Sequence, residues 1–256
     1  IFIRNPKGIT LTKDGVEFLS YARQVVEQTN LLEERYKSHT ETRELFSVSS
    51  QHYAFVVNAF VSLLKRADMT RYELFLRETR TYEIIEDVKN FRSEIGVLFL
   101  NGYNRDVLTK MFDDNRLTYT SLFKARPHIF VSKSNPLAKH KVVSLEDLED
   151  FPYLSYDQGI HNSFYYSEEI LSQIPHKKSI VVSDRATLFN LLIGLDGYTI
   201  ATGILNSNLN GDNIVSIPLD VDDEIDIVYL KHQKATLSKM GEKFLDNLVK
   251  EVTFDN

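Results

Sequence analysis

The chain of 256 residues contains no cysteine, no low-complexity tract and no internal repeat. The absence of cysteine excludes disulfides, thiolate metal sites and cysteine nucleophiles, and it is compatible with a reducing cytoplasm. No apolar run approaches the roughly 18 residues that are needed to span a bilayer, so we expect no membrane partner. With 43% hydrophobic and 26% charged residues, the composition is typical of a folded globular protein.

The short motifs of common enzyme families are also missing. The sequence has no G-x-S-x-G, no H-E-x-x-H, no G-x-x-x-x-G-K-[ST] and no G-x-G-x-x-G, which are signatures of hydrolases, zinc proteases and nucleotide-binding proteins. Its histidines never fall four residues apart, so they predict no metal site on a helix. We therefore expect a protein that is not an enzyme and that needs no cofactor.

Positive charge is concentrated at the start of the chain, although the net charge is −6. The first 13 residues contain Arg4, Lys7 and Lys13 and no acidic residue. Pro6 and Gly8 predict a tight turn between two apolar triplets. Thr12 is a typical helix N-cap, so the opening predicts a basic hairpin followed by a helix.

The predicted helix has an apolar seam with alternating spacings of four and three residues. The seam consists of Phe18, Ala22, Val25, Leu32 and Tyr36, with the polar Thr29 among them. This spacing is typical of a coiled-coil dimer, and the alternative is a helix that packs on its own domain. The polar segment 38–44 then predicts a domain boundary.

After this boundary, short apolar strands alternate with amphipathic helices. The segment 94–100, EIGVLFL, is almost entirely apolar, which is typical of a strand that is covered on both faces of a parallel sheet. The pattern repeats from residue 117 with different lengths. Two α/β lobes joined by extended crossovers explain the pattern better than one sheet of ten strands.

Polar residues follow three of the predicted strands. These residues are Ser49, Ser50 and Gln51, then Thr79, Arg80 and Thr81, and finally Ser183, Asp184 and Arg185. Each group is explained by plain N-capping. Small molecules, however, bind at the carboxyl ends of strands in open α/β sheets, so the three groups together predict a ligand cleft.

The opening resembles the wing and linker helix of LysR-type transcriptional regulators. The residues that carry this resemblance are Phe2, Arg4, Gly8, Leu11, Thr12, Gly15, Tyr21 and Ala22. The later segments SNPLAKHKVVSLEDLEDFPYL, LLIGLDGYTIATGI and IVSIPL are similar to parts of the same family. The chain departs from the family's usual pattern at Asp196–Gly197 and at Thr202–Gly203.

The resemblance implies an α/β fold with a two-lobed, periplasmic-binding-protein-like (type 2) effector domain. It assigns 1–12 to the wing of a truncated winged helix-turn-helix, 13–39 to the linker and dimerisation helix, 45–123 with 217–256 to subdomain I, and 124–216 to subdomain II. A helix-turn-helix would then precede Ile1. The family implies a cytoplasmic bacterial regulator that is a homodimer or homotetramer, binds promoter DNA and responds to a small-molecule effector.

The resemblance also implies roles for single residues. Arg4 and Lys7 of the wing are expected to contact DNA. The expected effector-binding residues are Ser49, Ser50, Gln51, Thr79, Arg80, Leu98, Phe99, Arg126, His128, Gln158, His161, Asn162 and Thr202. Because Arg80, Arg126, His128 and His161 are potential cations, we expect a small carboxylate or an amino-acid-like effector.

The alternative function is a transporter's solute-binding protein, which has the same two-lobed fold. Such a protein requires neither the basic hairpin nor the heptad-like helix. A deaminase of the porphyrin pathway on this fold would need a cysteine for its cofactor, and the chain has none.

Overall fold

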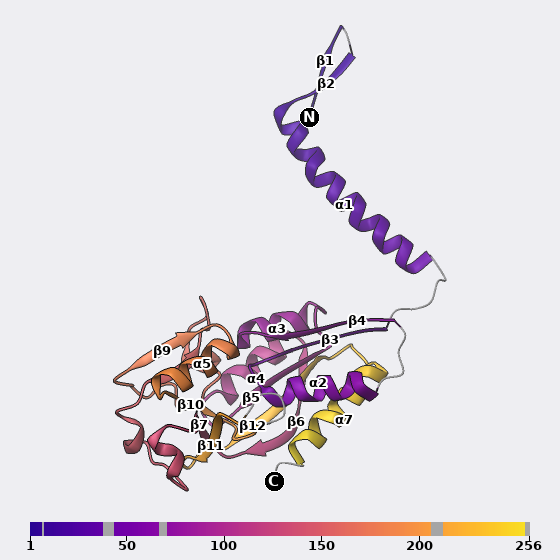
Figure 1. The fold of residues 1–256 in the computed structure, drawn as a ribbon. Helices are drawn as coiled ribbons and strands as arrows, with labels where there is room; N and C mark the ends of the chain where they lie inside the picture. Colours follow the sequence, from indigo (N-terminus) through magenta and orange to yellow (C-terminus); the bar gives the residue numbers. More distant parts are fainter. Residues whose placement is uncertain (7, 38–43, 67–70, 206–211, 254–256) are drawn as a thin grey trace. The chain divides into compact units, whose positions relative to one another are not determined.

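The structure is a computed structural model, and it describes residues 1–6, 8–37, 44–66, 71–205 and 212–253. Lys7 and the expected end of the linker helix at 38–39 lie outside the described residues. The chain forms two compact units, Ile1–Arg43 and Glu44–Asn256 (Figure 1).

The first unit is a hairpin followed by a long helix. Strands β1 (Phe2–Asn5) and β2 (Gly8–Leu11) pair antiparallel, and helix α1 covers Lys13–Lys37. The Thr12 hydroxyl accepts a hydrogen bond from the Gly15 amide at 2.9 Å, which caps the first turn of α1. A hairpin and a long helix therefore occupy the residues that the resemblance assigns to the wing and the linker helix.

The second unit contains two five-stranded sheets, each of which forms the centre of one lobe (Figure 1). The first lobe has the strand order β4-β3-β5-β12-β6. Its strands are β3 (Glu44–Ser50), β4 (Tyr72–Glu78), β5 (Ile95–Leu100), β6 (Leu117–Ala125) and β12 (Ile225–His232). Its helices are α2 (Ala54–Arg66), α3 (Thr81–Lys89), α4 (Arg105–Asp114) and α7 (Lys239–Thr253).

Helices cover both faces of the first sheet. Alternate residues of β5 divide between two core clusters, with Val97 and Phe99 in the cluster of α2 and α7, and Leu98 and Leu100 in that of α3 and α4. This alternation follows from the two-residue period of a strand. It explains why β5 is apolar throughout, as its sequence predicts.

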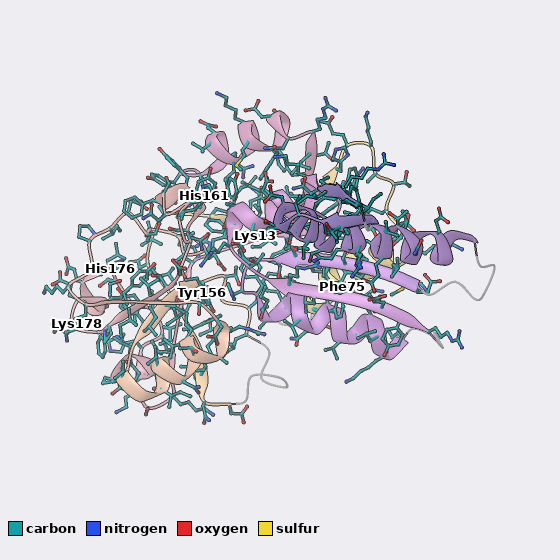
Figure 2. The ribbon with its side chains drawn as sticks, turned by 90° about the horizontal axis from the view of Figure 1, so that it is seen from above. Lys13, Phe75, Tyr156, His161, His176 and Lys178 are labelled. Carbon is teal, nitrogen blue, oxygen red and sulfur yellow. The ribbon has the colours of Figure 1, made fainter. Side chains whose placement is uncertain are left out.

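The second lobe has the strand order β11-β7-β10-β8-β9. Its strands are β7 (His128–Ser132), β8 (Tyr153–Tyr156), β9 (Ser179–Val182), β10 (Tyr198–Ala201) and β11 (Ile214–Pro218). Helix α5 (Arg185–Leu195) packs on it through Leu188 and Leu192. Three 3₁₀ turns, Pro136–Lys139, Glu146–Leu148 and Phe164–Tyr166, lie in its connections. Figure 2 shows the two lobes from above, with Phe75 on the first and Tyr156 and His176 on the second.

The sheets differ from the prediction in strand direction. Strand β3 is parallel to β4 and β5, as predicted, but β12 runs antiparallel between β5 and β6. In the second sheet β7 is antiparallel to both β10 and β11. Because β6 ends at Ala125 and β11 at Pro218, we propose lobe boundaries two residues later than the expected 123 and 216.

Candidate functional site

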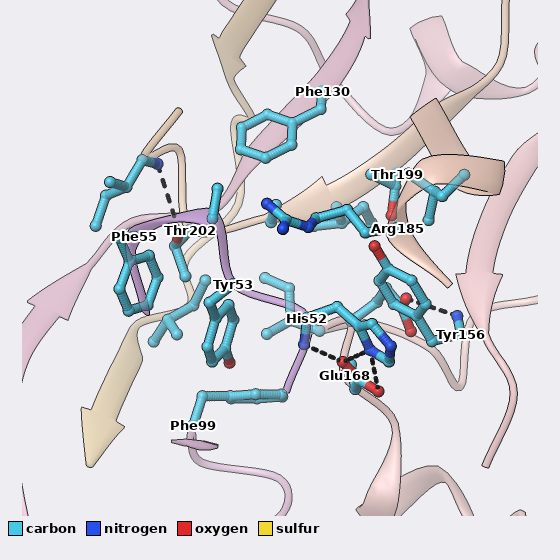
Figure 3. A pocket seen from close by; sticks show the side chains of 18 of the residues that line it. His52, Tyr53, Phe55, Phe99, Phe130, Tyr156, Glu168, Arg185, Thr199 and Thr202 are labelled. Atoms are coloured by element: carbon cyan, nitrogen blue, oxygen red, sulfur yellow. Dashed lines mark hydrogen bonds and ion pairs between the residues drawn. The ribbon is translucent and has the colours of Figure 1, made fainter. Parts of the chain in front are cut away.

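A pocket lies between the two lobes of the second unit (Figure 3). The first lobe contributes the segment 52–55, which begins α2, together with Phe99 and Ile225. The second lobe contributes the segments 168–170 and 199–202 and residues of α5. Small-molecule sites occur preferentially at such interfaces between domains.

Most of the pocket wall is apolar. Its large apolar side chains are Phe55, Phe99, Phe130, Phe189, Ile170, Leu188, Ile200, Ile204 and Ile225. Phe55 and Phe99 lie on one side of the pocket and Phe130 on another (Figure 3). Such a wall binds the apolar body of a ligand rather than a fully hydrated ion.

The polar side of the pocket is built around His52 and Glu168. The His52 Nδ1 atom lies 2.9 Å from the Glu168 carboxylate, and the His52 amide donates to the same oxygen at 2.8 Å (Figure 3). The His52 ring stacks on Tyr156 with centroids 4.0 Å apart. Burial lowers the pKa of His52, but the hydrogen bond to Glu168 and its charge outweigh that effect, so the net pKa is raised.

Glu169 adds a second buried carboxyl group beside Glu168. Only 3% of Glu169 is exposed, and its Oε1 accepts a hydrogen bond from the Tyr156 amide at 2.9 Å. Burial, followed by the charge of Glu168, raises the pKa of Glu169 well above its ordinary value. The protonated form of this carboxyl group is therefore favoured.

Two ion pairs join the lobes near the pocket. Arg185 on α5 pairs with Glu78 at 3.3 Å, and both side chains are mostly buried. Burial raises the pKa of Glu78, while the charge of Arg185 lowers it, and the net pKa is raised. Arg80 pairs with Asp157 at 2.5 Å. A Cβ at position 159 would lie only 2.8 Å from the Arg80 guanidinium, and the φ of Gly159 is +61°. Both features favour glycine at this position.

A chain of hydrogen bonds also crosses the junction between the lobes. The side-chain amide of Gln51 donates to the Thr81 hydroxyl at 2.6 Å, and the Thr81 backbone amide donates to the side-chain oxygen of Gln158 at 3.2 Å. Gln158 in turn donates to Glu168 at 3.1 Å. The carboxyl end of β3 is therefore connected through protein groups to the polar side of the pocket.

Two of the expected effector-binding residues, Phe99 and Thr202, line the pocket. The expected residues Gln51 and Gln158 lie in the hydrogen-bond chain beside it. Ser49 faces α3, where its hydroxyl lies 2.7 Å from both Asp87 and Ser93.

Other expected residues lie farther from the pocket wall. Leu98 is buried in the core under α3 and α4. The Thr79 hydroxyl donates to Glu83, and the buried Ser50 hydroxyl has no hydrogen-bond partner among the described residues.

None of the four potential cations that suggested an anionic effector lines the pocket. Arg80 is paired with Asp157, and the His161 ring stacks on Tyr82 with centroids 3.5 Å apart. Arg126 is exposed, and its carbonyl lies 2.9 Å from His128 Nδ1. Asn162 is exposed as well.

The sequence argument missed His52, Glu168 and Glu169 as pocket residues, whereas Arg185 belongs to the third group of polar residues that it placed at a strand end. His52 follows the polar end of β3 directly, so the strand-end rule applied one residue further would have included it. The two glutamates lie in a connection without regular periodicity, and a pair of adjacent acidic residues usually indicates a solvated surface.

The first unit shows the expected wing and seam residues on its surface. Arg4 is exposed, and so are Phe18, Val25 and Leu32, with 53%, 66% and 58% of their surfaces accessible. Ala22 is half-buried. The side chain of Tyr36 lies outside the described residues.

Comparison with known proteins assigns the family. The family model described as "LysR substrate binding domain" matches residues 49–253. The chain belongs to this family. The match includes both lobes and all residues of the pocket between them. No curated protein sequence matches the chain significantly.

Solved structures share the fold of this LysR chain at low sequence identity. A mutant of OxyR from Corynebacterium glutamicum has a TM-score of 0.60 and 13% identity, over 98% of this chain and 77% of that one. A full-length OxyR variant from Pseudomonas aeruginosa has a TM-score of 0.58 and 15% identity, over 97% of this chain and 84% of that one. The effector-binding domain of QuiR in complex with shikimate has a TM-score of 0.54 and 16% identity, over 82% of this chain and 97% of that one.

Within the described residues, no group of three or more His, Cys, Asp or Glu is arranged to hold a metal ion. In the same part of the chain, no helix combines the length and the hydropathy needed to cross a membrane.

Proposed function

We propose that this chain is the effector-responsive part of a LysR-type transcriptional regulator, and that a small metabolite in the pocket between the lobes controls promoter binding. The observation that carries the proposal is the mostly apolar pocket to which both lobes contribute. Membership of the LysR substrate-binding domain family supports it. A shikimate complex of a protein with the same fold supports a small-molecule effector.

The geometry supports a mechanism in which the ligand changes how the lobes are held together. His52, Arg80 and Glu78 of the first lobe all pair with charged residues of the second. A ligand that binds between the lobes alters the free energy of these contacts and shifts the population of closed and open forms. Through this shift, the ligand would change the arrangement of the lobes to which a DNA-binding segment is attached.

The first unit supports the proposal of an oligomeric DNA-binding protein. Phe18, Val25 and Leu32 of α1 expose an apolar stripe that a second copy of the helix would cover. Arg4 provides a positive charge for phosphate contacts. We propose a homodimer or homotetramer, and analytical ultracentrifugation that shows a monomer at micromolar concentration would contradict it.

A thermal-shift screen of metabolites tests the effector proposal. A ligand at 100 times its dissociation constant should stabilise the protein by roughly 2.7 kcal/mol. The variant Ala201→Leu, which adds volume to the pocket wall, should abolish the shift, and Ala235→Leu in a turn outside the pocket should retain it. A ligand that stabilises both variants equally would place the effector elsewhere.

A further inference from the structure

The pocket of the proposed effector site has an unusual balance of charge. Its lining contains two carboxyl groups, Glu168 and Glu169, and two basic groups, His52 and Arg185. His52 is bonded to Glu168, and Arg185 is paired with Glu78. Both basic side chains of the lining are therefore already next to a carboxylate.

Glu169 differs from the other charged residues of the lining. Among the described residues no Lys, Arg or His forms an ion pair with it, and its hydrogen bonds come from backbone amides. A carboxylate that is buried without a countercharge loses its hydration without compensation, so its protonated form is favoured. The wall around it is otherwise aromatic and aliphatic.

From the lining we infer that the pocket takes a small apolar or aromatic amine, whose ammonium group pairs with Glu169 while its apolar body fills the aromatic wall. This inference rests on the proposed function, because it names the chemical class of the effector. A carboxylate ligand would instead approach Glu168 and Glu169, with both basic groups of the lining already engaged. It differs from the sequence-based expectation of a small carboxylate or an amino-acid-like effector, which stays a prediction.

The charge of the ligand has a second consequence, which is proton release. The titratable groups that interact with Glu169 are Glu168, Tyr53, Tyr153 and Tyr156, and none of them carries a positive charge. Because burial raises the pKa of Glu169, the empty pocket holds the proton and an ammonium group expels it. At pH values below that pKa, amine binding should release up to about one proton. In the same range, amine affinity should increase by up to about tenfold for each unit by which the pH rises.

Isothermal titration calorimetry with matched probes tests the inference. The probes are phenethylamine, phenethyl alcohol and phenylpropanoate, and the indole analogues tryptamine, tryptophol and indolepropanoate. We expect at least one amine to bind more tightly than its matched alcohol and carboxylate. Titrations at pH 6 in two buffers of different ionisation enthalpy should show the release of a proton.

The variant Glu169→Gln keeps the size of the side chain and removes its charge. It should weaken amine binding roughly ten- to a hundredfold, since hydrogen bonds to charged groups contribute about 1.5–3 kcal/mol. It should also remove the proton release and leave the affinity of the alcohol unchanged. Glu149→Gln, on an exposed carboxylate outside the pocket, is the control and should bind like the parent chain.

Tighter binding of the carboxylates, an amine preference that survives in Glu169→Gln, or no binding of any probe would each overturn the inference. The proposed function fails separately. If carboxylates or alcohols bind and Ala201→Leu blocks them, the pocket is an effector site of another class. If the metabolite screen also yields no ligand, the effector proposal itself is wrong.

Discussion

Removal of the Glu168 side chain should reveal how strongly the lobes are held together. In Glu168→Ala, the carboxylate that accepts hydrogen bonds from the His52 amide, the His52 ring and Gln158 is lost. The side chains of His52 and Glu168 are only 6% and 3% exposed, so water does not readily replace it. Breaking a buried pair from one side costs about 3–5 kcal/mol, and we expect a decrease of that size in the free energy of unfolding.

The chain offers a matched control for this substitution. Glu149 also forms an ion pair, with Lys177 at 2.5 Å, but the two side chains are 57% and 63% exposed. Glu149→Ala should therefore change stability much less than Glu168→Ala, because solvent screens an exposed ion pair. Urea unfolding of the two variants, followed by circular dichroism, gives both free energies. Equal costs for Glu168→Ala and Glu149→Ala would refute the reasoning from burial.

The cost of Glu168→Ala should also depend on pH. Because the pKa of His52 is raised in the folded protein, its contribution to stability is fully present below its unfolded pKa and is lost as pH rises through the folded pKa. The unfolding cost of the substitution should therefore be larger at pH 5.5 than at pH 9. A cost that grows with pH would contradict the assigned partner.

Three other substitutions test separate parts of the structure. Leu98→Ala should destabilise the protein by about 2–5 kcal/mol in urea unfolding without changing ligand affinity, because Leu98 lies in the core under α3 and α4. Asp184→Ala should lower stability measurably in the same assay, by less than Leu98→Ala, since its carboxylate caps α5 by accepting from the Thr187 amide at 2.8 Å. The pKa of Glu169 is higher in the folded chain than in the unfolded one, so this group stabilises the fold fully below its unfolded pKa. That stability is lost as pH rises through the folded pKa, at up to about 1.36 kcal/mol per pH unit. Glu169→Gln should remove this slope, and an unchanged pH profile of unfolding would show that Glu169 is not the group.

The two-lobed α/β fold could be predicted because local sequence patterns report burial. Strand β5 is apolar at every position since helices cover both faces of its sheet. The direction of β12 could not be predicted in this way. It pairs with β5 and β6, which lie about a hundred residues earlier in the chain, and periodicity carries no information on such long-range pairing.

The position of the candidate site was only partly predictable. The strand-end rule located the edge of the sheet, but alternation along β3 turns Ser49 toward α3, where it bonds Asp87. The polar groups of the pocket, Glu168 and Glu169, come from an irregular connection of the second lobe. Only the folded chain shows that they lie opposite His52 and beside an apolar wall.

A crystal structure of the chain with a ligand from the metabolite screen is the most direct test of the account. We expect density for the ligand between the lobes, in contact with Phe99 and Phe130 and within hydrogen-bond distance of a polar group of the pocket such as Glu169. Density for the ligand at any other surface, with the pocket empty, would contradict the central claim that this cavity is the effector site.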